Sequence, residues 1–392
     1  MKAIMGSSSL NDPNRPAITD HGGGTRVPFV TDASEIPYWI TSIGPAEAAM
    51  VADTIARRSF SLGPVTNAFE AEIAAQLDVP YALCATSGSM SLVLALMALG
   101  IGPDDEVIVP TRTFIATAHA ATILGAKPVF VDCLPDTPLI DPIAIKKKIT
   151  RRTRVIIPVH LNGRAAAMEV ILDLAKRHGI AVVEDAAQAI FSRHRSLGHL
   201  GTIGDAGMFS FSMVKLVATG QGGAVVSRRR DLYEKMRSTR NHGVADVVSH
   251  EYTGPGGNFK FNDVLASIGL CQIRDRDKKV AHVKEIYAAY CDGLSGFPFI
   301  RVLNVDVDAG EVPLWTEVVS DKRDAIMAYL AKHGIQTRRF VPCCHSAPHF
   351  SSNESFPNSE RFSATGFVLP CGPAMPMDFV HKTIDALRNY RS

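Results

Sequence analysis

The chain has 392 residues, of which 46% are hydrophobic, and a formal net charge of +2 from 41 basic and 39 acidic side chains. This length allows two or three domains with a large buried core. The near balance of charge argues against nucleic acid or an anionic membrane as the main partner. No stretch approaches the roughly 18 uninterrupted apolar residues of a membrane-spanning helix.

Seven cysteines are spread over the chain, and no pair has the spacing of zinc ligands. An odd number of scattered cysteines favours a reducing compartment. Residues 1–20 are polar and lack the apolar run of a signal peptide. We therefore expect a cytoplasmic protein without a metal site, whose first residues form a loose arm.

Short apolar strands alternate with helices over the first half of the chain. Helices are expected to begin at residues 45 and 65, and strands are expected at residues 81–85, 106–109, 128–131, 155–159 and 181–183, with further helices at 91–99, 115–124, 143–149 and 168–178. The strands are continuous apolar runs, as expected for strands buried on both faces. The pattern predicts an α/β fold with a mostly parallel central sheet flanked by helices.

The alternation changes after residue 207. Strand-like runs at residues 208–211 and 224–227 predict a hairpin, and a helical stretch at 265–289 is interrupted by the charged run 274–279. A strand at 312–319 and helices at 322–333 and from 377 onward complete the chain. We expect an N-terminal arm at 1–44, a large domain at 45–275 and a small C-terminal α+β domain at 276–392.

Lys215 and Asp185 each follow a strand-like run and together point to one chemistry. Lys215 has apolar neighbours, and burial lowers the pKa of an amine, which favours the neutral form that attacks an aldehyde. A carboxylate such as Asp185 beside a pyridine nitrogen favours the protonated ring. Taken alone, Lys215 also fits a surface lysine and Asp185 a helix N-cap. The pair predicts a site for pyridoxal 5′-phosphate (PLP).

Other polar and aromatic residues follow the predicted strands. In parallel sheets, ligands bind beyond the carboxyl ends of the strands. The residues Ser87, Gly88 and Ser89 precede a helix, where free N–H groups favour a phosphate, although a simple N-cap serine is the alternative. Phe114 can stack on a flat cofactor or belong to the core. Candidate hydrogen-bonding residues for the ring and the phosphate are Gln188 and Ser210.

Many segments in order resemble the DegT/DnrJ/EryC1/StrS family of PLP-dependent sugar aminotransferases. The similarity extends from about Pro45 to the C-terminal helix. The segments that carry it are Gly63-Pro64-Val65, Ser87-Gly88-Ser89, Gly102 to Ile108, Pro158 to Gly163, Glu184 to Gln188, Gly204 to Gly207, Phe209-Ser210-Phe211 and Lys215 to Gly223. The resemblance implies an aspartate-aminotransferase-like fold (fold type I) and a homodimer with shared active sites.

The resemblance also implies roles for individual residues. Lys215 matches the lysine that forms the Schiff base, and Asp185 the acid at the pyridine nitrogen. The remaining matches are Gln188 at the ring hydroxyl, Phe114 as the stacking ring, Gly88, Ser89 and Ser210 at the phosphate, and Asn258, which reaches the cofactor phosphate of the neighbouring subunit. Two positions depart from the family: Ser89 stands where threonine is usual, and Lys260 where arginine is common.

The resemblance implies transamination of a nucleotide-linked keto sugar, with glutamate or glutamine as the amino donor. A cyclitol ketone as substrate stays open, because the motifs do not separate the two rings. A non-catalytic binding or regulatory protein of the same fold is a third possibility. The intact Lys215 and Asp185 argue against it.

Overall fold

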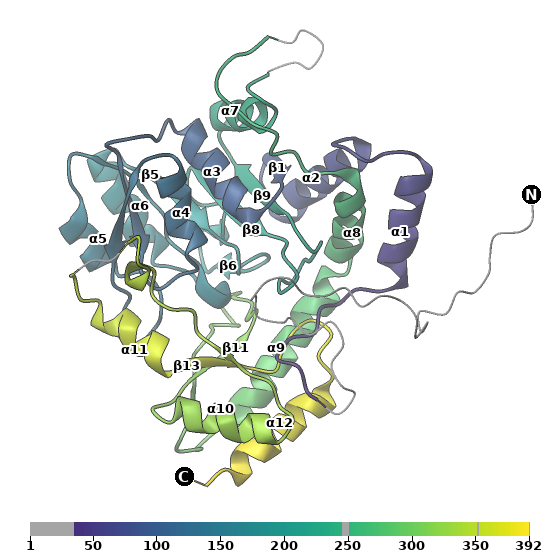
Figure 1. Cartoon of the computed structure of the whole chain (residues 1–392), viewed down its shortest axis with the longest axis vertical. Helices are drawn as coiled ribbons and strands as arrows, with labels where there is room; N and C mark the ends of the chain where they lie inside the picture. The colour runs from purple at the N-terminus through teal and green to yellow at the C-terminus, as the bar shows by residue number, and fades with distance from the viewer. Residues whose placement is uncertain (1–34, 245–250, 351–352, 392) are drawn as a thin grey trace, which may run out of the picture. The chain divides into compact units, whose positions relative to one another are not determined.

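The computed structural model describes residues 35–244, 251–350 and 353–391. Its central sheet comprises β1 (Tyr81–Ala85), β2 (Glu106–Pro110), β3 (Lys127–Val131), β4 (Thr153–Ile156), β5 (Ala181–Asp185), β8 (Ala206–Ser210) and β9 (Gly223–Ser227). The strand order is β1-β9-β8-β5-β4-β2-β3. Figure 1 labels four of these strands, β1, β9, β8 and β5. Only β9 runs antiparallel to its neighbours in this sheet, which confirms a mostly parallel arrangement with a β8–β9 hairpin.

Helices cover both faces of the central sheet. On β2, Val107 and Val109 pack with α3 (Gly88–Ala98), α4 (Ala116–Ile123) and α7 (Arg230–Arg240). Ile108 points the other way and packs with α5 (Pro142–Lys148) and α6 (Met168–His178). Side chains alternate along a strand, so a fully apolar strand is buried on both faces, as expected from the sequence.

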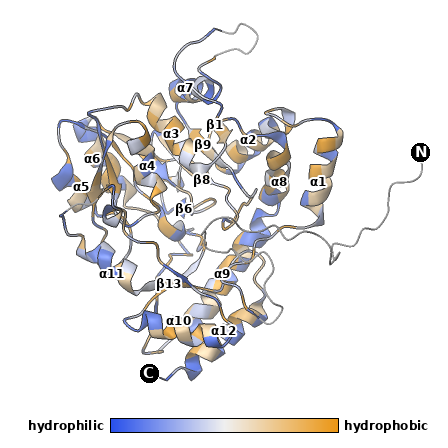
Figure 2. Cartoon of the chain, viewed as in Figure 1, coloured by the Kyte–Doolittle hydropathy of each residue, from blue (hydrophilic) through white to orange (hydrophobic). Residues whose placement is uncertain are grey.

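Helix α3 is apolar on nearly all sides, as its colour in Figure 2 shows. Such a helix is stable only where neighbours surround it. It contacts β8 and β9 of the sheet and also α4 and α7. The side chain of Ser87 caps its first turn by accepting a hydrogen bond from the Met90 backbone N–H at 3.2 Å. The helix therefore begins at Gly88, three residues before the predicted start.

The C-terminal part forms a smaller antiparallel sheet with its own helices, as expected. Its strands are β10 (Arg301–Val302), β11 (Thr316–Val319), β12 (Arg338–Arg339) and β13 (Gly366–Leu369), in the order β10-β11-β13-β12. Its helices are α9 (Arg276–Gly293), α10 (Arg323–Lys332), α11 (Pro357–Thr365) and α12 (Met377–Asn389). A boundary at residue 275 between two domains stays a prediction.

The remaining elements are α1 (Pro45–Ala56), α2 (Pro64–Gln76), α8 (Asp263–Arg274), the short pair β6 (Arg193–His194) and β7 (Gly198–His199), and the single turns η1 (Leu161–Gly163) and η2 (Cys344–Ser346). The predicted helical stretch at 265–289 is thus two helices that meet at Asp275. Of the predicted N-terminal arm at 1–44, residues 1–34 lie outside the described residues. Ile36 and Trp39 are buried and form bridges with Ile335 and Cys371.

Two predicted strands are shorter in the structure. Strand β4 ends at Ile156 because Pro158 has no N–H for the ladder, although Val159 still forms a bridge with Asp185. The strand predicted at 312–319 begins only at Thr316. Just before this strand, the Asn162 side chain forms hydrogen bonds with both backbone groups of Trp315. Its Oδ1 accepts from the Trp315 N–H at 2.6 Å, and its Nδ2 donates to the Trp315 carbonyl at 2.8 Å.

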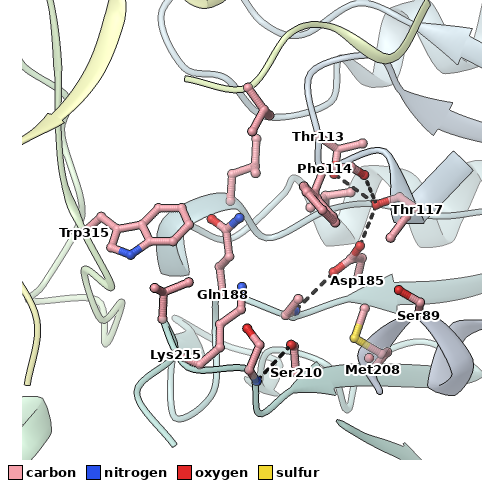
Figure 3. A pocket seen from close by; sticks show the side chains of 18 of the residues that line it. Ser89, Thr113, Phe114, Thr117, Asp185, Gln188, Met208, Ser210, Lys215 and Trp315 are labelled. Atoms are coloured by element: carbon pink, nitrogen blue, oxygen red, sulfur yellow. Dashed lines mark hydrogen bonds between the residues drawn. The ribbon is translucent and has the colours of Figure 1, made fainter. Parts of the chain in front are cut away.

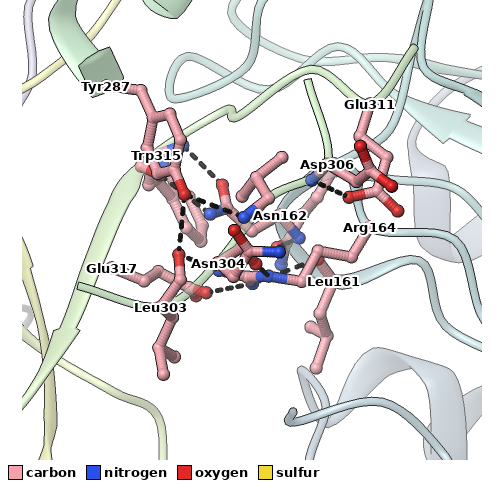
Figure 4. A network of polar contacts seen from close by, with 12 residues as sticks. Leu161, Asn162, Arg164, Tyr287, Leu303, Asn304, Asp306, Glu311, Trp315 and Glu317 are labelled. Atoms are coloured by element: carbon pink, nitrogen blue, oxygen red, sulfur yellow. Dashed lines mark hydrogen bonds and ion pairs between the residues drawn. The ribbon is translucent and has the colours of Figure 1, made fainter. Parts of the chain in front are cut away.

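A buried ion pair joins the loop after β4 to the C-terminal sheet (Figure 4). Arg164 Nη1 donates to Glu317 Oε2 on β11 at 2.6 Å. The Arg164 Nε also donates to the Asn304 carbonyl at 2.6 Å. Both side chains are almost fully buried, so water does not screen the pair. The loop that carries Asn162 and the strand that carries Glu317 are therefore held together by charge as well as by hydrogen bonds.

Replacing Arg164 by methionine is expected to lower the free energy of unfolding by about 3–5 kcal/mol, because Glu317 would remain buried without its cation. Denaturant unfolding monitored by circular dichroism measures this change. The control is Arg195→Gln, which breaks an exposed pair with Asp306 (N–O distance 3.0 Å) and should cost less than about 1 kcal/mol. Equal losses in the two variants would contradict the expected role of the Arg164–Glu317 pair.

Among the described residues, no helix combines the length and the apolar character needed to cross a membrane. All seven cysteines are described, and all are free thiols. The chain is therefore held together without disulfides.

Candidate active site

A cavity of about 370 Å³ lies at the carboxyl ends of β5 and β8 (Figure 3). Strands, loops and the start of α3 converge on it, as expected for an open parallel sheet. All but one of the predicted site residues line it: Gly88, Ser89, Phe114, Asp185, Gln188, Ser210 and Lys215. The exception is Asn258.

Lys215 lies in the connection between β8 and β9 and is buried. Its Nζ is 5.6 Å from the centre of the Trp315 ring. Burial lowers the pKa of the Lys215 amine to about 8, although Asp185 opposes the shift. At pH 7 about a tenth of this amine is therefore a neutral nucleophile, far more than for an ordinary lysine with a pKa of about 10.4.

The connection after Lys215 is held tightly by backbone hydrogen bonds. The Thr219 N–H donates to the Phe211 carbonyl at 2.9 Å, and the Phe211 N–H donates to the Gly222 carbonyl at 2.9 Å. Gly222 has a φ of +139°, and a Cβ there would come within 2.6 Å of the Phe261 ring. Only glycine fits at this position, so the glycine-rich turn that follows Lys215 is closely packed.

The lowered pKa of Lys215 predicts a pH-dependent stability of the cofactor-free protein. The pKa is about 8 in the folded state, against a usual value of 10.5. Between these values the unfolded state binds more protons, so the free energy of unfolding rises with pH through this window. Lys215→Met removes the buried charge and should be more stable than wild type by on the order of 3 kcal/mol at pH 7.

That advantage of Lys215→Met should shrink as the pH rises from about 8 toward 10.5. Urea unfolding of both cofactor-free proteins at several pH values measures it. A difference in stability that does not change with pH would show that the amine is not desolvated in the folded protein.

Asp185 is the last residue of β5 and is buried beside the cavity. Thr117 Oγ1 donates to its Oδ2 at 2.7 Å, and the Ala187 N–H donates to its Oδ1 at 3.1 Å. Burial raises the pKa of this carboxyl, while the hydrogen bonds and Lys215 oppose that shift. A further cation bound in the cavity would therefore favour the ionised form of Asp185.

The hydroxyl of Thr117 has one proton and several neighbours. It lies 2.7 Å from Asp185 Oδ2 and 3.1 Å from the Phe114 carbonyl, so the hydroxyl donates its hydrogen bond to the nearer carboxylate oxygen. Thr113 Oγ1, at 3.0 Å, then donates to Thr117. This chain of hydroxyl groups orients Asp185 toward the cavity (Figure 3).

The start of α3 provides a site for an anion. Ser89 lies in the first turn, whose backbone N–H groups have no acceptor within the helix. Ser210 ends β8 beside it, and a Cβ on Gly88 would come within 3.0 Å of the Ser210 Cβ. Gly223 packs even more closely, since its Cβ would lie 2.5 Å from the Gly88 nitrogen. Small residues thus let β8 and β9 approach the helix start.

Phe114 and Gln188 lie on other sides of the cavity. Phe114, in the loop between β2 and α4, is 56% exposed, so it is not the core phenylalanine that remained an alternative. Gln188 Oε1 accepts a hydrogen bond from the Asn162 N–H at 2.8 Å. Its amide nitrogen is left to donate to a ligand, and Figure 3 shows the side chain reaching into the space between Lys215 and Phe114.

Asn258 is exposed and does not line this cavity. It forms an isolated bridge with Asn241, whose Oδ1 accepts from Lys260 Nζ at 2.9 Å. Its expected role toward a neighbouring subunit stays a prediction.

Several lining residues were not identified from the sequence, among them Arg112, Thr117, Trp315, Glu317 and Arg338. Thr117 lies on α4, and its distance from Asp185 in the chain hides their contact. The C-terminal part contributes Trp315, Glu317 and Arg338. The strand pattern in the first half of the chain does not predict where this part lies. No local sequence signal marks them.

The residues present fit PLP. The cavity offers a buried amine of lowered pKa for an aldehyde, a buried carboxylate for a ring nitrogen, and a helix start with nearby hydroxyls for a phosphate. A cationic ring nitrogen would favour the ionised form of Asp185, whose pKa burial raises. Because Gly223 has no side chain, β9 can pack directly against the start of the helix.

Comparison with known proteins agrees with this site. The model of the DegT/DnrJ/EryC1/StrS aminotransferase family matches residues 41–388. The chain is 36% identical over 348 residues to the dTDP-3-amino-3,4,6-trideoxy-alpha-D-glucose transaminase of Streptomyces venezuelae, covering 87% of this chain and 91% of that one. It is 32% identical over 335 residues to the GDP-perosamine synthase of Escherichia coli O157:H7, covering 85% and 92%.

A solved structure has the same fold. The crystal structure of S. venezuelae DesV in complex with a ketimine intermediate matches with a TM-score of 0.85 at 33% identity, covering 91% of this chain and all of that one. The family match spans most of the chain and includes both Asp185 and Lys215. The protein belongs to the DegT/DnrJ/EryC1/StrS aminotransferase family and is a PLP-dependent enzyme of the aspartate-aminotransferase fold.

Proposed function

We propose that this protein transfers an amino group from glutamate or glutamine to the ketone of a nucleotide-linked deoxysugar. The observation that carries the proposal is a cavity lined by both a desolvated lysine amine and a buried carboxylate. The substrate class is supported by the names of the relatives, a dTDP-aminosugar transaminase and a GDP-perosamine synthase.

The proposed roles of the residues follow from their positions. When bound, PLP supplies an electron sink that stabilises negative charge on the substrate carbon bearing the nitrogen. Lys215 would hold the cofactor aldehyde through its amine. When that amine is free, Lys215 Nζ would take the proton from the substrate carbon that bears the nitrogen and deliver it to the cofactor carbon, and it would move a proton the opposite way when the ketone is aminated. Asp185, oriented by Thr117, keeps the ring nitrogen protonated.

The other lining residues would fix the cofactor in place. Ser89, Ser210 and the N-terminal turn of α3 hold the phosphate. Phe114 would cover one face of the ring, and Gln188 would donate a hydrogen bond to the ring hydroxyl oxygen. The amide of Gln188 is suited to this role because its own oxygen is already occupied by the Asn162 N–H.

We also propose a cytoplasmic homodimer in which Asn258 serves the partner's site. The free cysteines support a reducing compartment, and the exposed position of Asn258 outside its own cavity leaves it open to a partner. Light scattering of the purified protein tests the dimer.

The decisive experiment is mass spectrometry of products formed with glutamate or glutamine from a panel of keto acceptors. The panel contains dTDP- and GDP-linked keto-deoxysugars and free cyclitol ketones. A nucleotide-sugar product whose mass shows that an amine has replaced one keto oxygen supports the proposal. Amination of cyclitols alone assigns the alternative ring substrate, and a protein that stays colourless with added PLP would overturn an enzymatic role.

A further inference from the structure

Arg112 is a buried cation at the cavity with no hydrogen-bond acceptor. It lies in the loop after β2, is 3% exposed, and lines the cavity beside Phe114. The centre of its guanidinium is 4.4 Å from the centre of the Phe340 ring. In the part of the chain that the structure describes, Arg112 donates no hydrogen bond, and its buried Nε has no partner.

Burying an arginine whose N–H groups have no acceptor costs free energy unless a ligand supplies acceptors. A guanidinium has five N–H donors, and buried polar groups are almost always paired. Burial lowers the pKa of Arg112, which Glu317 opposes. Stacking on Phe340 compensates for part of the desolvation but accepts none of the N–H bonds. A ligand with acceptor oxygens would satisfy the side chain.

The cationic side chains around the cavity are not all paired with carboxylates, so a bound anion would be electrostatically favoured. Glu317 is paired with Arg164 at 2.6 Å, and Asp324, which lies 3.2 Å from Arg339, also pairs with Arg323 at 2.7 Å. Within the described residues, neither Arg112 nor Arg338 forms an ion pair with a carboxylate. The guanidinium of Arg338 lies 5.9 Å from the centre of the Trp315 ring, on the same ring that Lys215 approaches.

We propose that Arg112 binds a carboxylate of a substrate and that Arg338 adds to the positive potential of this subsite. The inference rests on the proposed amine transfer, because that reaction brings carboxylated molecules into the cavity. The planar fork of an arginine matches the two oxygens of a carboxylate, and the pair is strongest where water is excluded. The carboxylate has two possible sources: the amino-acid donor and an acid group on the acceptor ring.

Calorimetric binding to the PLP-loaded enzyme tests the proposal with two probes. Glutarate has the carboxylates of the donor without its amine, and glucuronate is a carboxylated sugar without the ketone. Arg112→Met retains a long apolar stem over Phe340 but cannot donate. Arg112→Lys retains the charge without the fork, and Arg195→Gln, at an exposed pair away from the cavity, is the control.

Arg112→Met should weaken binding of one probe by on the order of 10- to 100-fold, as expected for lost hydrogen bonds to a charged group. Arg112→Lys should lose less affinity, and Arg195→Gln none. If Arg112→Met loses affinity for glutarate alone, Arg112 binds the donor carboxylate. If it loses affinity for glucuronate alone, Arg112 binds an acid group on the acceptor. If it loses affinity for both, Arg112 binds the carboxylate of either molecule. Unchanged affinity for both probes, or a wild-type enzyme that binds neither, would overturn the proposal.

A kinetic measurement separates this subsite from folding and from the overall reaction. The KM of the carboxylated substrate should rise in Arg112→Lys, while kcat at saturation stays within a few fold. The circular dichroism spectrum and the cofactor absorbance of each variant establish that it folds and holds PLP. Because the calorimetric readout needs no turnover, failure of the proposed amine transfer would leave the carboxylate result interpretable.

Discussion

Lys215→Ala is expected to lose amine transfer by at least the roughly 10²–10⁴-fold that general acid–base catalysis contributes, since the same Nζ also holds the cofactor. Among the described residues that line the cavity, no other amine can replace it, because arginine side chains stay protonated. Steady-state turnover with glutamate and a keto nucleotide sugar measures the loss. Borohydride reduction followed by peptide mass spectrometry should find the cofactor mass on Lys215 in wild type only.

Lys279 provides a matched control for this prediction. It is also a buried lysine, and burial lowers its pKa to about 8. Its Nζ donates to Gln272 Oε1 at 2.5 Å and to the Gln272 carbonyl at 3.1 Å, and it does not line the cavity. Lys279→Met should therefore retain turnover and the reduced adduct on Lys215. Normal turnover by Lys215→Ala would end the proposed role of that residue.

The sequence predicted the parts of the fold that depend on local pattern. The helix Met168–His178 has the predicted bounds because its apolar face is periodic and Gly179, with a φ of +65°, ends it. The strand Tyr81–Ala85 is likewise as predicted. Helix α7 was missed because it is polar, with buried positions only at Leu232, Met236 and Arg240.

The site was predictable where one strand end carries one functional residue. Asp185 and Lys215 follow apolar runs, and the parallel topology brings such ends to one edge of the sheet. Trp315 and Arg338 were not predictable, since nothing local indicates that the C-terminal sheet would cover this edge. Arg112 was not predictable either, because burial without a partner is a property of the fold and not of the sequence.

Asp185→Asn is the second substitution with a large expected effect on catalysis. The amide keeps the size of the side chain and can still accept from Thr117 Oγ1, which lies 2.7 Å from the wild-type oxygen. What it loses is the negative charge. A neutral amide does not favour a protonated ring nitrogen, so turnover should fall by on the order of 10²–10³-fold, comparable to removing one preorganised electrostatic group.

The charge argument also predicts what Asp185→Asn should preserve. Burial raises the pKa of Asp185, so the folded protein gains no stability from ionising it without a cation. Asp185→Asn should therefore fold normally when cofactor-free, bind PLP more weakly, and show an absorbance maximum that differs from wild type. Asp141→Asn is the control: Asp141 caps α5 by accepting from the Ile143 N–H at 2.8 Å, a role that asparagine fills equally well.

Thr117→Val separates the charge of Asp185 from its orientation. The valine removes the donor to Oδ2 while the Ala187 N–H, at 3.1 Å from Oδ1, still holds the carboxylate. One hydrogen bond to a charged group is worth about 1.5–3 kcal/mol, so turnover should fall by roughly 10- to 100-fold, less than in Asp185→Asn. A Thr117→Val variant as impaired as Asp185→Asn would mean that the position of the carboxylate, and not its charge, limits the reaction.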